Sequence, residues 1–157
     1  MREKAVGLYL YYTGSRLWLA GGRVASWYSA YSGKAGQYEP IPDGVYWINH
    51  SEVHQLTFLD DLRQKLLGDL YHLEPGSGWL AHQVGWGTYR IPIRQTSAQE
   101  QRTGRGNFFI HGGAQPGSAG CIDLTKQMPM FVGHLNQEVT WAKQDRLPLY
   151  VDNTLGP

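Results

Sequence analysis

Short runs of strand-forming residues, separated by glycine and proline turns, fill the first third of the chain. Because aromatic and β-branched residues favour strands, and glycine readily adopts the positive φ that tight turns need, this pattern predicts antiparallel strands joined by hairpins. The predicted strands span residues 6–12, 16–20, 24–32 and 45–49, with turns at Thr13-Gly14, Gly21-Gly22 and Asp43-Gly44.

The hydrophobic period changes after residue 50. Leucines spaced by three or four predict an amphipathic helix over residues 52–67, with Ser51 as N-cap and Gly68 as its stop. Further strands are expected at 79–84, 88–93, 107–111 and 147–151, a surface loop at 95–106, and a short helix at 128–135. Pro148 favours an edge position for the last strand, because proline cannot donate a ladder hydrogen bond. We therefore expect one β-dominated domain over residues 1–157, an antiparallel sandwich or barrel with one main helix.

The composition of the chain limits the kinds of partner that it can bind. The chain has 157 residues, of which 41% are hydrophobic and 17% charged, and its formal charge is +1. Such a balance supports a packed core and argues against a nucleic-acid partner, which would need a basic surface. No stretch approaches the ~18 apolar residues of a membrane helix, and the first residues do not read as a secretory signal.

The chain contains a single cysteine, Cys121, and a histidine ten positions before it, His111, with a glycine-rich segment between them. Such a segment allows the chain to double back, so that an imidazole can take the thiol proton and return it to a leaving amine. The backbone N–H groups of Cys121 and Gly120 are candidate oxyanion donors, and the carbonyl of Gly112 or Gly113 a candidate partner for the second imidazole nitrogen.

Other interpretations of these residues remain open. A lone cysteine beside Ile122 is commonly a small core residue, and a histidine after a strand is commonly a turn residue. His50 and His54 have the i, i+4 spacing of metal ligands, but no nearby residue completes a set, so we expect no metal and no cofactor.

The segment Ser118-Ala119-Gly120-Cys121-Ile122, with His111-Gly112 upstream, resembles the active-site signature of the L,D-transpeptidase (YkuD-like) family. The short spacing from histidine to cysteine, with Trp86-Gly87-Thr88-Tyr89-Arg90, is most similar to L,D-transpeptidase-like effectors of type VI secretion. The resemblance implies that Cys121 is the nucleophile and His111 the base. It also implies that the loop residues Ser118, Gly120, Gly112 and Gly113 shape the oxyanion site.

Two positions depart from the family pattern. Ala119 stands where the family has a second histidine, and Asp123 where it often has Asn or Arg, so a substrate carboxylate needs another partner. The candidate substrate-binding residues are Arg90, Arg94, Arg105, Trp86, Tyr89 and Asp123.

The resemblance implies attack on the bond before the terminal D-alanine of peptidoglycan tetrapeptide stems, followed by hydrolysis or D-amino acid exchange. The effector subgroup implies an antibacterial toxin that is injected into the target periplasm, with a secretion spike or tube component and an immunity protein as partners. The absence of a recognisable export signal fits that route. A housekeeping cross-linking enzyme and a catalytically inactive wall-binding module are the alternatives.

Overall fold

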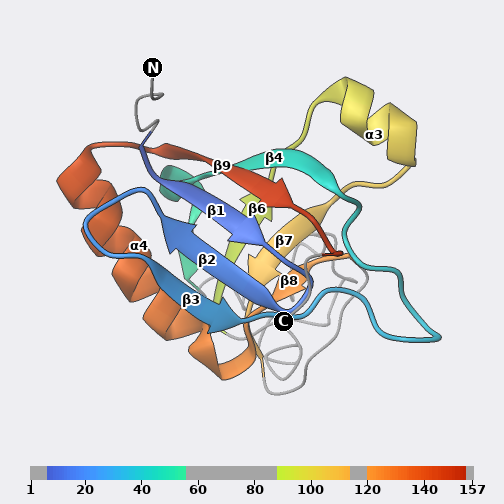
Figure 1. Ribbon diagram of the computed structural model, residues 1–157, viewed down its shortest axis with the longest axis horizontal. Helices are drawn as coiled ribbons and strands as arrows, with labels where there is room; N and C mark the ends of the chain where they lie inside the picture. The colour runs from blue at the N-terminus through green and yellow to red at the C-terminus, as the bar shows by residue number, and fades with distance from the viewer. Residues whose placement is uncertain (1–6, 56–87, 114–119, 155–157) are drawn as a thin grey trace, which may run out of the picture.

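The computed structural model describes residues 7–55, 88–113 and 120–154, which form two mixed β-sheets and two α-helices. Sheet A has the strand order β3-β2-β1-β9-β4, and sheet B the order β5-β6-β7-β8 (Figure 1). Sheet A consists of β1 (Tyr9–Tyr12), β2 (Arg16–Ala20), β3 (Ser26–Ser29), β4 (Gly44–Asn49) and β9 (Arg146–Val151). Sheet B consists of β5 (His54–Gln55), β6 (Tyr89–Ile93), β7 (Phe108–His111) and β8 (Ile122–Asp123).

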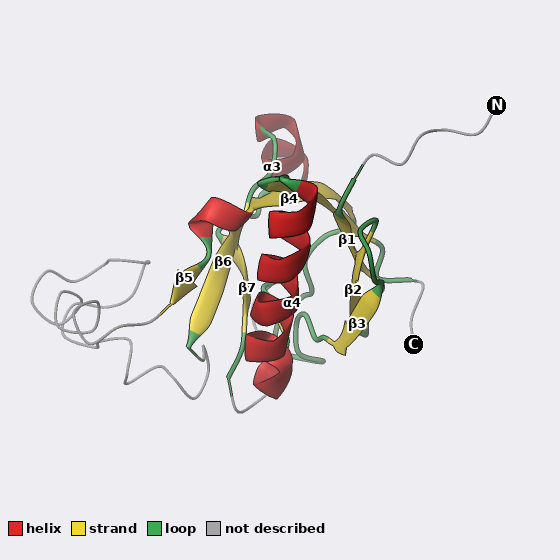
Figure 2. Cartoon of the chain, turned by 90° about the vertical axis from the view of Figure 1, so that its left-hand side faces the viewer, coloured by secondary structure: helices red, strands yellow, loops and turns green. Residues whose placement is uncertain are grey.

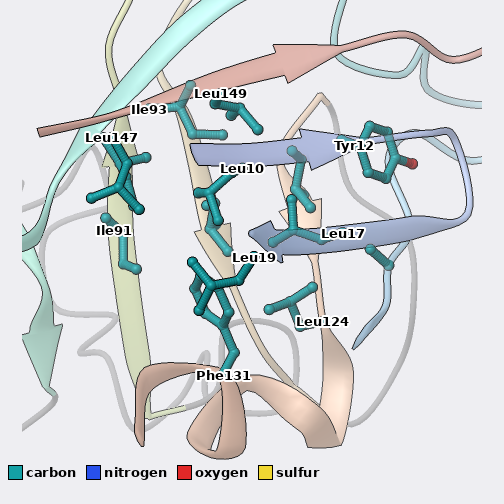
Figure 3. Close-up of a cluster of buried hydrophobic side chains, with 14 of the residues drawn as sticks. Leu10, Tyr12, Leu17, Leu19, Ile91, Ile93, Leu124, Phe131, Leu147 and Leu149 are labelled. Atoms are coloured by element: carbon teal, nitrogen blue, oxygen red, sulfur yellow. The ribbon is translucent and has the colours of Figure 1, made fainter. Parts of the chain in front are cut away.

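Alternation along the strands of sheet A determines where the core lies. On β1 and β2 every second residue is buried, because successive side chains point to opposite faces of a sheet. The buried residues of sheet A meet Ile91 and Ile93 of sheet B and Phe131 of helix α4 (Figure 3). A single cluster of buried side chains thus joins both sheets and the helix.

Helix α4 (Met128–Ala142) follows the short 3₁₀ helix η2 (Thr125–Gln127) and lies in front of the two sheets, with sheet B on its left and sheet A on its right in Figure 2. Pro129 lies in its first turn, where a missing N–H costs nothing. The helix ends at Lys143, which adopts a left-handed conformation. The predicted helix at 128–135 is therefore present but too short, because the buried face continues to Val139.

The predicted β-dominated fold with antiparallel hairpins is confirmed, as are the strands near 6–12, 16–20, 24–32, 45–49, 88–93 and 107–111. The predicted edge position of 147–151 is wrong, because β9 pairs with β1 on one side and β4 on the other. Pro148 is tolerated there because its partner in β4, Trp47, directs its own backbone N–H and C=O to Arg94 instead.

Two further predictions need correction. The helix predicted from residue 52 does not begin there: 3₁₀ helix η1 (His50–Glu52) leads into extended β5, and the rest of the predicted helix lies outside the described residues, as does 79–84. The predicted loop 95–106 contains helix α3 (Ser97–Thr103). The Thr96 side chain accepts a hydrogen bond from the Gln99 N–H at its start, and Gly104 closes it at φ 68°.

Candidate active site

A row of ionisable side chains crosses sheet B. His54, Arg90, His111 and Asp123 are register partners on the four successive strands. The neighbouring row consists of Ile91, Ile110 and Ile122, all completely buried in the core. Since register partners share a face and adjacent residues alternate, the ionisable row lies on the face of sheet B opposite the core.

Cys121 lies on that same face. Ile110 pairs with Ile122, so Cys121, one residue earlier, lies beside Phe109, and its thiol has a hydrogen bond with the Phe109 backbone. Because Cys121 is two residues from Asp123, it points to the face that carries His111. A strand spacing of ~4.8 Å and a rise of ~6.6 Å over two residues separate the two Cα atoms by about 8 Å, which an imidazole and a thiol can span together.

The ring orientation of His111 follows from its backbone partner. Nδ1 lies 2.7 Å from the carbonyl oxygen of Gly112. A carbonyl can only accept, so Nδ1 carries the proton, and Nε2 is the basic nitrogen of the neutral ring. This is the contact that the sequence led us to expect of Gly112 or Gly113.

The environment keeps both groups neutral. Burial lowers the pKa of His111 to about 4, and the positive charge of Arg90 lowers it further. The hydrogen bond to the Gly112 carbonyl acts in the opposite direction, because it favours the protonated ring. Burial raises the pKa of Cys121 to about 11, although the Phe109 backbone and Arg90 both favour the thiolate. The resting pair is therefore a thiol beside a neutral imidazole, not a preformed thiolate–imidazolium pair.

The sulfur of Cys121 is almost completely buried. Cys121 is 6% exposed and His111 2%, whereas a nucleophile in an open groove would show more of its surface. A pocket of about 310 Å³ adjoins this face and is lined by residues of η1, β5 and β6 together with Phe109 of β7: Ser51, Glu52, Val53, His54, Arg90, Pro92, Arg94 and Phe109. Arg90 and Phe109 thus contact both the pocket and the Cys121 environment.

Two candidate substrate-binding residues, Arg90 and Asp123, are buried. Arg90 is 1% exposed, with its guanidinium 4.6 Å from the centre of the Phe109 ring. Asp123 is fully buried; its Oδ1 accepts a hydrogen bond from the Thr125 N–H and lies 4.0 Å from Nδ1 of His111. The charge of Arg90 influences the pKa of both His111 and Cys121, and the charge of Asp123 that of Cys121.

The other candidate site residues lie in different places. Arg94 pairs with Glu52 at the pocket rim. Tyr89 packs against the core, because it alternates with Arg90 and points to the opposite face, so it does not line the site. Ser118 and Trp86 lie outside the described residues.

The last candidate, Arg105, lies near the residue that precedes Cys121. It donates to the backbone carbonyls of Pro40 at 2.7 Å and Glu39 at 3.0 Å, and a side-chain atom built on Gly120 would lie 2.7 Å from its Nη2. The guanidinium therefore lies close to Gly120, the residue before Cys121, and 5.5 Å from the centre of the Phe108 ring.

Glycine is required at two positions of the site. A Cβ on Gly112 would lie 2.7 Å from the Met128 Cβ and 2.8 Å from the Thr125 carbonyl oxygen. Gly120 has φ +92°, and a Cβ there would lie 2.5 Å from the Phe108 ring. Gly113 also has a positive φ, 135°. Contacts between these loops and their neighbours explain the glycines independently of catalysis.

The sequence did not predict that His54 belongs to this row, or that Arg90 and Asp123 flank His111 on the two adjacent strands. A signal was present: Arg90-Ile91, Ile110-His111 and Ile122-Asp123 each place a charged or polar residue beside an isoleucine. Recognising it required the register. Within the described ranges, no three His, Cys, Asp or Glu residues gather as metal ligands, and no helix is long and apolar enough to cross a membrane.

Comparison with known proteins shows similarity at the level of fold. No family model and no curated protein matches the chain. The structure of Bdellovibrio bacteriovorus Bd1075 superposes with a TM-score of 0.52 at 13% identity, over 93% of this chain and 48% of that one. Mycobacterium tuberculosis L,D-transpeptidase 1 superposes with a TM-score of 0.42 at 15% identity, over 93% of this chain and 59% of that one.

The match to Bd1075 shows a shared fold at low sequence identity. The chain spans about half the length of these two solved structures.

Proposed function

We propose that this chain is a cysteine-dependent peptidoglycan-modifying enzyme that acts on tetrapeptide stems by L,D-transpeptidase chemistry. The observation that carries the proposal is the placement of Cys121 and His111 on one face of neighbouring strands, with Nδ1 of the histidine held by Gly112. The motif around Cys121, which resembles the family signature, supplies the substrate class.

The chemistry follows from the protonation states. The Cys121 sulfur attacks the carbonyl carbon before the terminal D-alanine while Nε2 of His111 takes the thiol proton. That proton passes to the departing amine, so D-alanine leaves and a thioester remains. Water then yields the tripeptide, and a D-amino acid yields an exchanged stem. Because the resting pair is neutral, proton transfer accompanies the attack instead of preceding it.

The decisive measurement is mass spectrometry of purified disaccharide tetrapeptide after incubation with the protein. The wild type should release D-alanine, and Cys121→Ala should not, while its circular dichroism spectrum and Tm show a folded protein. A variant at an exposed position elsewhere, Met130→Ala, is the control. Hydrolysis by Cys121→Ala at the wild-type rate would refute the proposal.

The cellular role within this proposal is that of an injected antibacterial effector, with a cognate immunity protein and a secretion spike or tube component as partners. Its site of action is the target periplasm. The short motif spacing supports this role. Expression directed to the periplasm of a susceptible bacterium should lyse the cells, and cytoplasmic expression should not. Toxicity that is equal in both compartments would contradict the assignment.

The burial of Cys121 favours a second candidate, a catalytically inactive wall-binding module. The thiol is 6% exposed and its pKa is raised to about 11, as for an inert core cysteine. This candidate predicts that the protein sediments with sacculi and leaves the masses of all muropeptides unchanged.

A further inference from the structure

The face of sheet A that points away from the core carries a row of large side chains. Trp27 pairs with Trp18, Trp18 with Tyr11, Tyr11 with Tyr150, and Tyr150 with Val45. Register partners share a face, so this row crosses all five strands. At ~4.8 Å per strand it is roughly 19 Å long. The face is turned toward the viewer in Figure 1.

The row is accessible in the described part of the structure. Trp27 is 46% exposed and Val45 57%, and the tryptophan and tyrosines between them are half-buried. Ring centroids lie 6.4 Å apart for Trp18 and Trp27 and 6.3 Å for Tyr11 and Tyr150. Two members of the row, Tyr11 and Trp18, also line an open pocket of about 350 Å³. The other lining residues are Tyr9, Thr13 and Ala20.

The charge on this sheet has one sign. The five strands contain two arginines, Arg16 and Arg146, and no Asp or Glu. Arg16 lies 4.2 Å from the ring centre of Trp27, and Arg146 5.1 Å from that of Trp47. Trp27 ends the row on β3, and Trp47 lies on β4 two residues from Val45. One guanidinium therefore stands at the β3 end of the row, and the other stands beside the row on β4.

We propose that this face binds a polysaccharide strand that carries carboxylates, with its sugar rings on the aromatic row and its acidic groups near Arg16 and Arg146. A pyranose ring has an apolar face of C–H groups, which packs on the negative face of an aromatic ring. The length and shape of the row fit an extended chain, and the arginines complement an anionic one. The proposal holds whether or not Cys121 is catalytic.

The probe is a solution of peptidoglycan glycan strands with tripeptide stems, which lack the terminal D-alanine and cannot be turned over. Titration should quench tryptophan fluorescence, and isothermal calorimetry should give a matching Kd. Neutral chitin oligosaccharides should bind more weakly, and 0.5 M salt should remove the difference. Equal binding of the neutral and acidic chains would refute the assignment of the arginines.

The variants test the row itself. Trp27→Ala, on an outer strand and largely exposed, should weaken binding about tenfold. Arg16→Gln with Arg146→Gln should weaken binding of the acidic chain and leave that of chitin oligosaccharides unchanged. Trp141→Ala is the matched control, because Trp141 is 55% exposed and has Arg23 5.7 Å from its ring centre, but lies on α4. Wild-type affinity of Trp27→Ala would overturn the proposal.

The same face could instead be covered by a second copy of the chain. Sedimentation velocity from micromolar to millimolar concentration distinguishes this, and a dimer that Trp27→Ala dissociates, with no glycan binding, would overturn the proposal. Muropeptide turnover by Cys121 is measured separately, so a failure of the glycan site leaves the enzymatic assignment standing, and the reverse also holds.

Discussion

The protonation state of Cys121 is open to direct chemical measurement. Burial raises the thiol pKa from 9.0 to about 11, so the thiolate fraction at neutral pH is about a hundredfold below that of an ordinary cysteine. A more basic thiolate is more nucleophilic, with a Brønsted coefficient of ~0.4–0.5, which restores roughly tenfold over two pKa units. Alkylation should therefore be about tenfold slower than for a free thiol, before restricted access slows it further.

The assay is iodoacetamide modification followed by intact-protein mass spectrometry between pH 6 and pH 10, with the urea-unfolded chain as the reference. In the folded protein the logarithm of the rate should rise with unit slope across the whole range, and in urea it should level off near pH 9. A rate plateau below pH 7 in the folded protein would show a preformed thiolate–imidazolium pair. That result would refute the neutral resting state deduced from burial.

Three further predictions concern stability and rate. Because the folded-state pKa of His111 is lowered from 6.5 to about 4, the unfolded chain binds the proton first, so stability should fall by about 3 kcal/mol as pH drops from 6.5 to 4. His111→Gln should remove most of this slope in urea titrations at several pH values, and an unchanged slope would contradict it. Gly112→Ala should cost about 1–3 kcal/mol, because its Cβ would lie 2.7 Å from that of Met128. The control Gly133→Ala, within α4 and with nothing in reach, should stabilise by about 0.5–1 kcal/mol; equal Tm shifts would show that the clash is absent. Asp123→Asn should lower the kcat of D-alanine release about 10–100-fold, because it removes the charge 4.0 Å from Nδ1 of His111 while Gly112 still holds the tautomer. An unchanged kcat would show that the Asp123 charge does not assist His111.

Local patterns predicted most of the strands because each has its own signal. The alternation in residues 9–12 and 16–20 reflects one buried and one outward face, and the glycine turns mark where each strand ends. The helical period after residue 50 was misleading in part, because His54 and Gln55 are held extended by pairing with β6. Helix α3 was missed since its polar residues bury nothing, and its capping by Thr96 was the signal available.

The composition of the site followed a similar division. Cys121 and His111 stood out by residue type and by the glycines around them, and the Gly112 carbonyl contact followed from the same segment. The burial of Cys121 and His111 could not be predicted from the sequence, because exposure depends on what packs over a residue. The sequence offers Arg90 and Asp123 as substrate-binding candidates but does not indicate that both are buried beside the histidine, because burial depends on the packing of distant segments.

What the sequence alone determined is the class of fold and the identity of the cysteine–histidine pair, since both depend on residues close together in the chain. Tertiary structure decided the rest through strand register. The pairing of β6, β7 and β8 aligns Arg90, His111 and Asp123, which are far apart in sequence, and the insertion of β9 between β1 and β4 aligns the aromatic row on sheet A. Register is set by long-range contacts, because a slip of one residue would exchange the two faces of each strand.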